Sequence, residues 1–155
     1  MTQLDNVVFL PLRQLSELIK TRQVSPVEVT RVFLDRLERL GPHYNSVVTL
    51  TTERAMRQAL QAEQEIAAGH YRGFLHGIPY GAKDLLATSG GIPTTWGAAP
   101  LRNQVFNYEA TVISKLEEAG AVLVAKLAMI ELTGGMGYRQ PNASFTGPVS
   151  TPWSK

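Results

Sequence analysis

Lys83 is the residue whose type and setting most suggest chemistry. It lies in the stretch HGIPYGAKDLLATSGGIPTTWG, residues 76–97, and is its one lysine. If residues 77–83 are extended, Pro79, Gly81 and Lys83 share one face, so small residues surround the amine. A lysine acts as a general base only when neutral, a form that burial or a nearby positive charge favours. The pattern alone favours a solvated lysine at the end of a strand, paired with Asp84 or another carboxylate, and leaves the catalytic role open.

Two glycine-rich stretches, SGGIPTTWG and TGGMGYRQ, are candidates for backbone that approaches a ligand. Neither contains the G-x-x-x-x-G-K-[ST] pattern of a phosphate-binding loop or the G-x-G-x-x-G pattern of a dinucleotide site. Turns that need a positive φ are the simpler interpretation, because glycine adopts that conformation without steric cost. Loops that approach a substrate remain the alternative.

Other polar residues show weaker patterns. The histidines have no metal-ligand spacing, so no metal site is expected, and no serine sits in a G-x-S-x-G elbow. Lys126 interrupts the apolar run VLVAKLAM. We expect it to end that strand or to extend its ammonium group to solvent, with Glu131 as a possible partner.

The elements that must position these residues alternate along the chain. Amphipathic spacing predicts helices over residues 11–23, 25–41, 52–68 and 110–120. The second should begin with a capping box of Ser25 and Glu28 and end at Gly41 and Pro42. Short β-branched or apolar runs predict strands over 45–51, 77–83 and 121–127. Such alternation predicts an α/β fold with some parallel pairing, and residues 78–83 should lie beside the strand 121–126.

Composition narrows the class of protein. The chain has 155 residues, 44% hydrophobic and 18% charged, with a formal net charge of +2 and no cysteine. Basic residues are scattered rather than clustered, so we expect no nucleic-acid contact. No apolar run is long enough for a transmembrane helix, and the beginning of the chain does not resemble a signal peptide, so we expect no membrane association and a cytoplasmic location.

Read in order, five segments resemble the amidase signature family. LHGIPYGAKDLL is similar to its G-[IV]-P-x-x-x-K-D segment, and IPTTWGA to its Thr-Thr-x-Gly. DRLERLGPHYNSVVTLT is similar to the preceding helix and strand, and EATVISKLEEAGAVLVAKLAMIEL to the block A-T-V-x-x-L-x-x-A-G-A-x-x-x-x-K-x-x-x-x-E. NASFTGPVSTPW is similar to the segment that leads into the family's catalytic Gly-Gly-Ser-Ser-Gly-Gly stretch. The series covers almost the whole chain and is closest in character to the branch of amidases and glutamyl-tRNA amidotransferase A subunits.

This resemblance implies an amide-bond hydrolase with a serine nucleophile, a second serine in a cis peptide and a lysine. Lys83 matches that lysine, as base and then acid, which reverses the interpretation from pattern alone. It implies a buried Lys83 directed towards Gly134 and Gly135, which match a substrate-binding loop. It also implies a mixed sheet with flanking helices, a small linear amide as substrate and no cofactor, and it allows an amidotransferase-like complex.

The sequence departs from the family pattern in three places. The loop from Lys83 to Thr94 is one residue longer than usual, and Thr151 replaces the asparagine before Pro-Trp. The sequence ends at Lys155, before the serine-bearing segment. We therefore expect residues 1–155 to be the N-terminal fragment of a single amidase domain, inactive when isolated. The alternative is a non-catalytic fragment or interaction module of the same fold.

Overall fold

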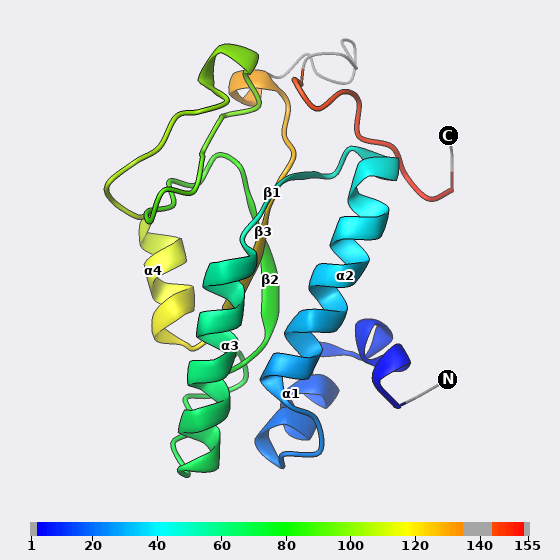
Figure 1. Ribbon diagram of the computed structural model, residues 1–155, viewed down its shortest axis with the longest axis vertical. Helices are drawn as coiled ribbons and strands as arrows, with labels where there is room; N and C mark the ends of the chain where they lie inside the picture. Colours follow the sequence, from blue (N-terminus) through cyan, green and yellow to red (C-terminus); the bar gives the residue numbers. More distant parts are fainter. Residues whose placement is uncertain (1–2, 135–143, 154–155) are drawn as a thin grey trace. The chain divides into compact units, whose positions relative to one another are not determined.

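The computed structural model describes residues 3–134 and 144–153 (Figure 1). Internal contacts divide the chain into two compact units. Unit 1 comprises Met1–Arg36, Thr51–Tyr80 and Ser114–Val124; unit 2 comprises Leu37–Leu50, Gly81–Ile113 and Ala125–Lys155. Within the described residues, no helix has the length and apolar character needed to cross a membrane.

The sheet has three strands, β1 (Val47–Leu50), β2 (Pro79–Lys83) and β3 (Val122–Leu127), in the order β1-β3-β2. β1 runs antiparallel to β3. β2 and β3 run parallel, because Val122 N donates to Ile78 O at 2.8 Å and Asp84 N donates to Leu127 O at 2.9 Å, so both strands advance together. The predicted mixed α/β sheet and the neighbouring positions of β2 and β3 are therefore confirmed.

Helix α2 (Pro26–Tyr44) begins where the sequence predicts and ends later. Ser25 Oγ accepts from Glu28 N and the Glu28 carboxylate accepts from Ser25 N, both at 3.3 Å, which completes the capping box. The predicted end at Gly41 and Pro42 is wrong, because Pro42 lies inside the last turn. The helix ends instead at Tyr44. Asn45, the next residue, has a φ of 51°, and Ser46 N donates to Gly41 O at 3.2 Å.

Unit 1 has an aliphatic core beneath helices α1 (Leu12–Lys20) and α3 (Thr52–Ala67). The buried members of this cluster are Val7, Leu15, Ile19, Val24, Val29, Ile66 and Ile78. Ala55, Ala59 and Ala62 of α3 are buried, Leu60 is exposed, and the polar residues Arg54 and Gln58 are also buried. The inward face of α3 is therefore partly polar.

Unit 2 has a smaller and more polar interior. Helix α4 spans Thr111–Glu118. Unit 2 includes only its first three residues, because the middle segment of this unit ends at Ile113. The 3-10 helices η2 (Ala99–Leu101) and η3 (Glu131–Thr133) also belong to it, whereas η1 (Gln3–Phe9) belongs to unit 1. The buried side chains of unit 2 include Asp84, Thr88, Thr94, Thr95 and Lys126. These polar groups surround the turn that follows Lys83.

Candidate functional site

Lys83 is the last residue of β2, at the carboxyl end of that strand. This is the end of a sheet at which α/β proteins place ligands. The side chain is exposed in this chain, so the expectation that it is buried is wrong. The residues on its face, Pro79 and Gly81, are too small to cover it, and the space beside Gly81 is filled by Leu127, whose Cδ1 would lie 2.7 Å from an added Cβ.

A tight turn fixes the backbone immediately after Lys83. Lys83 O accepts from Leu86 N at 3.0 Å, and Asp84 N donates to Leu127 O at 2.9 Å. Asp84 is fully buried, and its Oδ2 accepts hydrogen bonds from both the backbone N–H and the hydroxyl of Thr95, the former at 3.0 Å. The strand end that carries Lys83 is therefore held on both sides of its peptide bond to Asp84.

Lys126 lies inside unit 2 and does not reach solvent, so the predicted snorkelling geometry is wrong. The residue is fully buried, and its Nζ lies 3.3 Å from Asp84 Oδ1. Nζ also donates to Leu86 O and to Thr94 Oγ1, both at 2.8 Å. The carboxylate beside this ammonium group is thus that of Asp84, whereas the sequence suggested Glu131, which is exposed. A buried charge with these partners needs no path to water, because carbonyl, hydroxyl and carboxylate oxygens replace its hydration.

Gly134, a predicted substrate-binding residue, lies on the segment that leaves β3. It directly follows η3, which begins four residues after the end of β3, and its N–H donates to Glu131 O at 2.9 Å. Since β2 and β3 are parallel, this segment leaves the sheet at the same end as Lys83. Gly135, the second predicted residue, lies outside the described residues.

The other glycine-rich stretch behaves as a turn. Gly90 and Gly91 have φ values of 77° and 76°, and no atom of residues 3–134 or 144–153 lies near enough to restrict a side chain there. Gly97 also has a positive φ, 71°, and in addition a Cβ there would lie 2.6 Å from Met129 O. The conformational interpretation therefore applies to all three, and close backbone packing is a second reason for glycine at residue 97.

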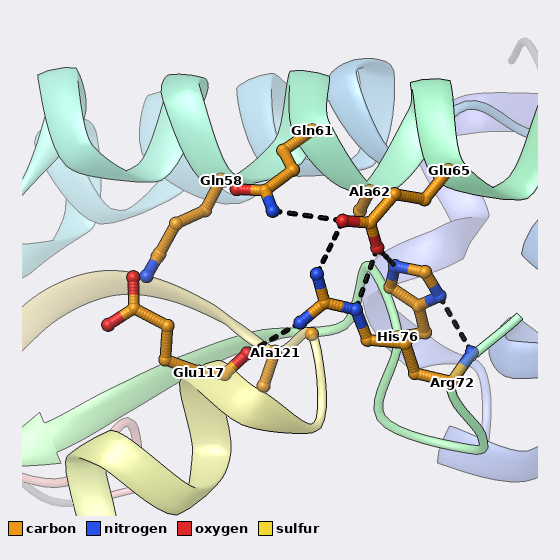
Figure 2. Close-up of a pocket in the computed structure, with 9 residues that line it drawn as sticks. Gln58, Gln61, Ala62, Glu65, Arg72, His76, Glu117 and Ala121 are labelled. Carbon is orange, nitrogen blue, oxygen red and sulfur yellow. Dashed lines mark hydrogen bonds and ion pairs between the residues drawn. The ribbon is translucent and has the colours of Figure 1, made fainter. Parts of the chain in front are cut away.

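A second polar cluster, in unit 1, was not predicted from the sequence (Figure 2). Glu65 accepts from Arg72 through both oxygens and from Gln61 at 2.9 Å, and its Oε2 lies 3.1 Å from His76 Nε2. His76 Nδ1 accepts from Arg72 N at 3.1 Å, which leaves the proton on Nε2. Arg72 also donates to Glu117 O and Glu118 O in the last turn of α4, at 3.2 and 3.1 Å.

This cluster lines a pocket of about 100 Å³. A signal for it exists in the sequence: Arg54, Gln58, Gln61 and Glu65 recur at helical spacing on α3 and so form a polar stripe. Arg54 donates to Glu117 at 2.7 Å, and Gln58 accepts from Leu123 N at 3.0 Å. These side chains join α3 to α4 and β3 inside unit 1. We call the cluster the brace; its members are Arg54, Gln58, Gln61, Glu65, Arg72, His76 and Glu117.

Proton affinities in the brace follow from these contacts. The hydrogen bond from Arg72 lowers the pKa of Glu65 from 4.5 to about 2, assisted by Gln61 and the positive charge of Arg72. Burial is the main cause that lowers the pKa of His76 below its usual 6.5, and the Glu65 carboxylate opposes the shift. The cluster thus holds an ionised carboxylate and favours a neutral imidazole.

Comparison with known proteins gives a consistent result. Residues 28–155 match the family model described as Amidase. The putative amidase AmiD of Mycobacterium tuberculosis is 42% identical over 149 residues, covering 96% of this chain and 30% of that protein. The A subunit of the glutamyl-tRNA(Gln) amidotransferase of Geobacter sp. is 41% identical over 144 residues, covering 93% of this chain and 29% of the relative.

A solved structure resembles the chain as well. A crystal structure of an amidase family protein from Bacillus anthracis aligns with a TM-score of 0.76 and 28% identity, covering 83% of this chain and 26% of that one. The chain spans about three tenths of the length of the curated relatives. With a family model that matches most of its residues and with this fold, the chain belongs to the amidase family.

Proposed function

We propose that this chain provides the lysine of an amide-bond hydrolase of the Ser-cisSer-Lys type that acts on small linear amides. The observation that carries the proposal is the place of Lys83 in an amidase-family chain, at the carboxyl end of β2 on a turn fixed by hydrogen bonds. Residues 1–155 would then be the N-terminal portion of a single amidase domain. Gly134 and Gly135 are proposed to line the substrate pocket.

The proposed reaction is acyl transfer through a serine ester. Neutral Lys83 accepts a proton from the second serine, which takes one from the nucleophilic serine as that oxygen attacks the amide carbonyl. The protonated lysine then returns the proton, by the same relay, to the departing amine, and water releases the acyl group. No metal or cofactor enters these steps. The serines are proposed to lie in a segment that follows Lys155.

Residues 1–155 are proposed to be inactive when isolated. The clearest alternative nucleophile among the described residues, Ser89, is a weak candidate because its hydroxyl donates to Glu109 at 3.1 Å, and its N–H donates to the same carboxylate. Glu109 thus fixes Ser89 in the loop between β2 and α4. Relatives named as amidotransferase subunits support the further proposal of an amidotransferase-like complex, and we propose a cytoplasmic location for it.

The test measures amide turnover by the full product of the gene that encodes this chain. Lys83→Ala should lower kcat/KM by about 10²–10⁴-fold, the usual loss when an acid–base group is removed. Lys115→Ala is the matched control, because Lys115 is an exposed lysine that pairs with the neighbouring Glu118 on α4. Turnover by Lys83→Ala within a few fold of the control would exclude Lys83 from the mechanism.

A further inference from the structure

The fully buried Lys126 occupies an otherwise apolar strand. β3 has the sequence VLVAKL, and its first five residues are all buried. An ammonium group removed from water loses several kcal/mol of hydration, so a buried ion pair is a poor means of gaining stability. A methionine would fill the same space without that loss. What Lys126 provides, and an apolar residue could not, is a set of directed hydrogen bonds.

Those hydrogen bonds join the two ends of the loop that follows Lys83. Lys126 Nζ donates to Leu86 O at the near end and to Thr94 Oγ1 at the far end. Leu86 N in turn donates to Lys83 O at 3.0 Å. Leu86 therefore bonds to both lysines, through its carbonyl to Lys126 and through its N–H to Lys83. Its backbone couples the position of Lys83 to that of Lys126.

Asp84 makes a second connection to the same backbone. Its carboxylate lies between Lys126 Nζ and the N–H and hydroxyl of Thr95, and its own carbonyl accepts from Trp96 N at 3.2 Å. Trp96 has a φ of 52°, a conformation that a bulky residue adopts only where its surroundings enforce it. The bond from Trp96 N to Asp84 O is one of the contacts that hold Trp96 in this conformation; another is the bond from Leu132 N to Trp96 O, at 2.7 Å.

Lys83 itself is held through its backbone. Its side chain is exposed, and among residues 3–134 and 144–153 no hydrogen bond or ion pair restrains its ammonium group. The direction in which that side chain leaves the strand is therefore set by the peptide groups on either side of it. Both are fixed, one within β2 and the other by the bond from Asp84 N to Leu127 O.

We propose that Lys126, Asp84, Thr94 and Thr95 form a positioning clamp for the reaction, which holds the turn after Lys83 and so places the Lys83 amine. The proposal rests on the proposed function of Lys83, and Lys126 acts through other residues without touching substrate. A displacement of about 1 Å can lower a rate by about 10²-fold, so a clamp of this kind has a measurable catalytic effect.

The main experiment uses the double variant Lys126→Met/Asp84→Asn, which removes both charges together and avoids leaving one of them buried alone. We expect kcat to fall by about 10–10²-fold while KM stays within about threefold, because the amine is displaced and the substrate contacts remain. The Leu86 amide should exchange its hydrogen at least about tenfold faster than in the wild type. The Ala55 amide, bonded to Thr51 O at 2.8 Å in unit 1, is the internal control and should not change.

Thr95 offers a conservative pair of variants. Thr95→Val keeps the shape and removes the hydroxyl that bonds Asp84, whereas Thr95→Ser retains the hydroxyl. We expect Thr95→Val to lower kcat by about tenfold or more and Thr95→Ser to remain within about threefold of the wild type. Equal losses in the two would show that methyl packing, and not the bond to Asp84, matters.

The two proposals fail in different ways. If the double variant is folded and keeps both its kcat and its slow Leu86 exchange while Lys83→Ala is inactive, the clamp is overturned and the role of Lys83 stands. If Lys83→Ala retains turnover, the proposed function fails, and with it the catalytic part of the clamp. If Leu86 exchange rises but kcat does not change, the clamp holds the turn without positioning the reaction, and the proposal is wrong.

Discussion

The brace in unit 1 and the clamp in unit 2 are both networks of charged side chains, yet they differ in solvation and in geometry. Arg72 and Glu65 of the brace keep 31% and 23% of their side chains exposed, whereas Lys126 and Asp84 of the clamp are completely buried. Arginine meets its carboxylate through a planar fork, while the ammonium group of Lys126 distributes its donors over the two ends of one loop. The brace joins α3 to α4 and β3, and the clamp fixes the loop that follows one candidate catalytic residue.

This difference predicts different responses to the loss of a partner. When the partner of a charge near water is removed, water can hydrate that charge again. Removal of the partner therefore lowers the free energy of unfolding only a little. Water cannot reach a charge that stays buried after its partner is removed. That unpaired charge strongly destabilises the folded chain. Four changes test this contrast, in order of decreasing expected effect.

Lys126→Met should have the largest effect on stability. It leaves the Asp84 carboxylate buried without its cation, and we expect the free energy of unfolding to fall by about 3–5 kcal/mol. Urea denaturation of the encoded protein measures this loss. The double variant Lys126→Met/Asp84→Asn should recover much of it, and a double variant less stable than the single one would contradict the assignment of the loss to an uncompensated charge.

Gly120→Ala should break the brace by steric overlap. Gly120 has a φ of 79°, and an added Cβ would overlap the ring of His76. Overpacking typically costs about 1–3 kcal/mol, and the left-handed conformation of alanine adds about 1–2 kcal/mol. Gly90→Ala is the matched control, because Gly90 has nearly the same φ, 77°, and open space around it. The difference in urea midpoint between the two variants isolates the His76 contact; equal midpoints would show that this contact is unimportant.

Glu65 should make the stability of the brace depend on acid. Its pKa is about 2 in the folded chain and 4.5 when unperturbed, so the stability that it contributes is complete above pH 4.5 and is lost as the pH falls towards 2. His76 adds a loss that begins at higher pH, because a pKa lowered below 6.5 by burial means that the unfolded chain takes up the proton first. In Glu65→Gln, the fall in unfolding free energy between pH 4.5 and 2 should be less steep. The measurement is the free energy of unfolding of the wild type and of this variant as a function of pH. Equal slopes between pH 4.5 and 2 would show that Glu65 does not cause the acid dependence.

Glu118→Gln should have the smallest effect. It breaks an ion pair with Lys115 in which both side chains are more than 60% exposed. Such pairs contribute about 0–1 kcal/mol, and salt screens them. A urea midpoint close to that of the wild type is expected. A loss as large as that of Lys126→Met would contradict the view that solvation explains the contrast between the networks.

Sequence patterns alone determined the order of helices and strands and the family. The capping box at Ser25, the alternation of β-branched runs with amphipathic helices, and the series of motifs around Lys83 are local features, so they are legible without coordinates. Local signals also located helix α2. They misplaced its end at Gly41, because the αL residue that follows the helix is Asn45. Asn adopts this conformation often enough to compete with glycine.

Only the tertiary structure decided which polar residues are buried and what they contact. Lys126 was expected to reach solvent, yet it is enclosed by Asp84, Leu86 and Thr94, whose sequence positions lie 32 to 42 residues away. Lys83 was expected to be buried and is exposed, because the small residues on its own face do not cover it and burial would need another segment to cover that face. His76 and Glu65 likewise meet across a turn whose geometry no short-range pattern specifies. Spacing along the chain identifies the face on which a side chain lies, whereas the partner that compensates its charge is chosen by contacts between distant segments.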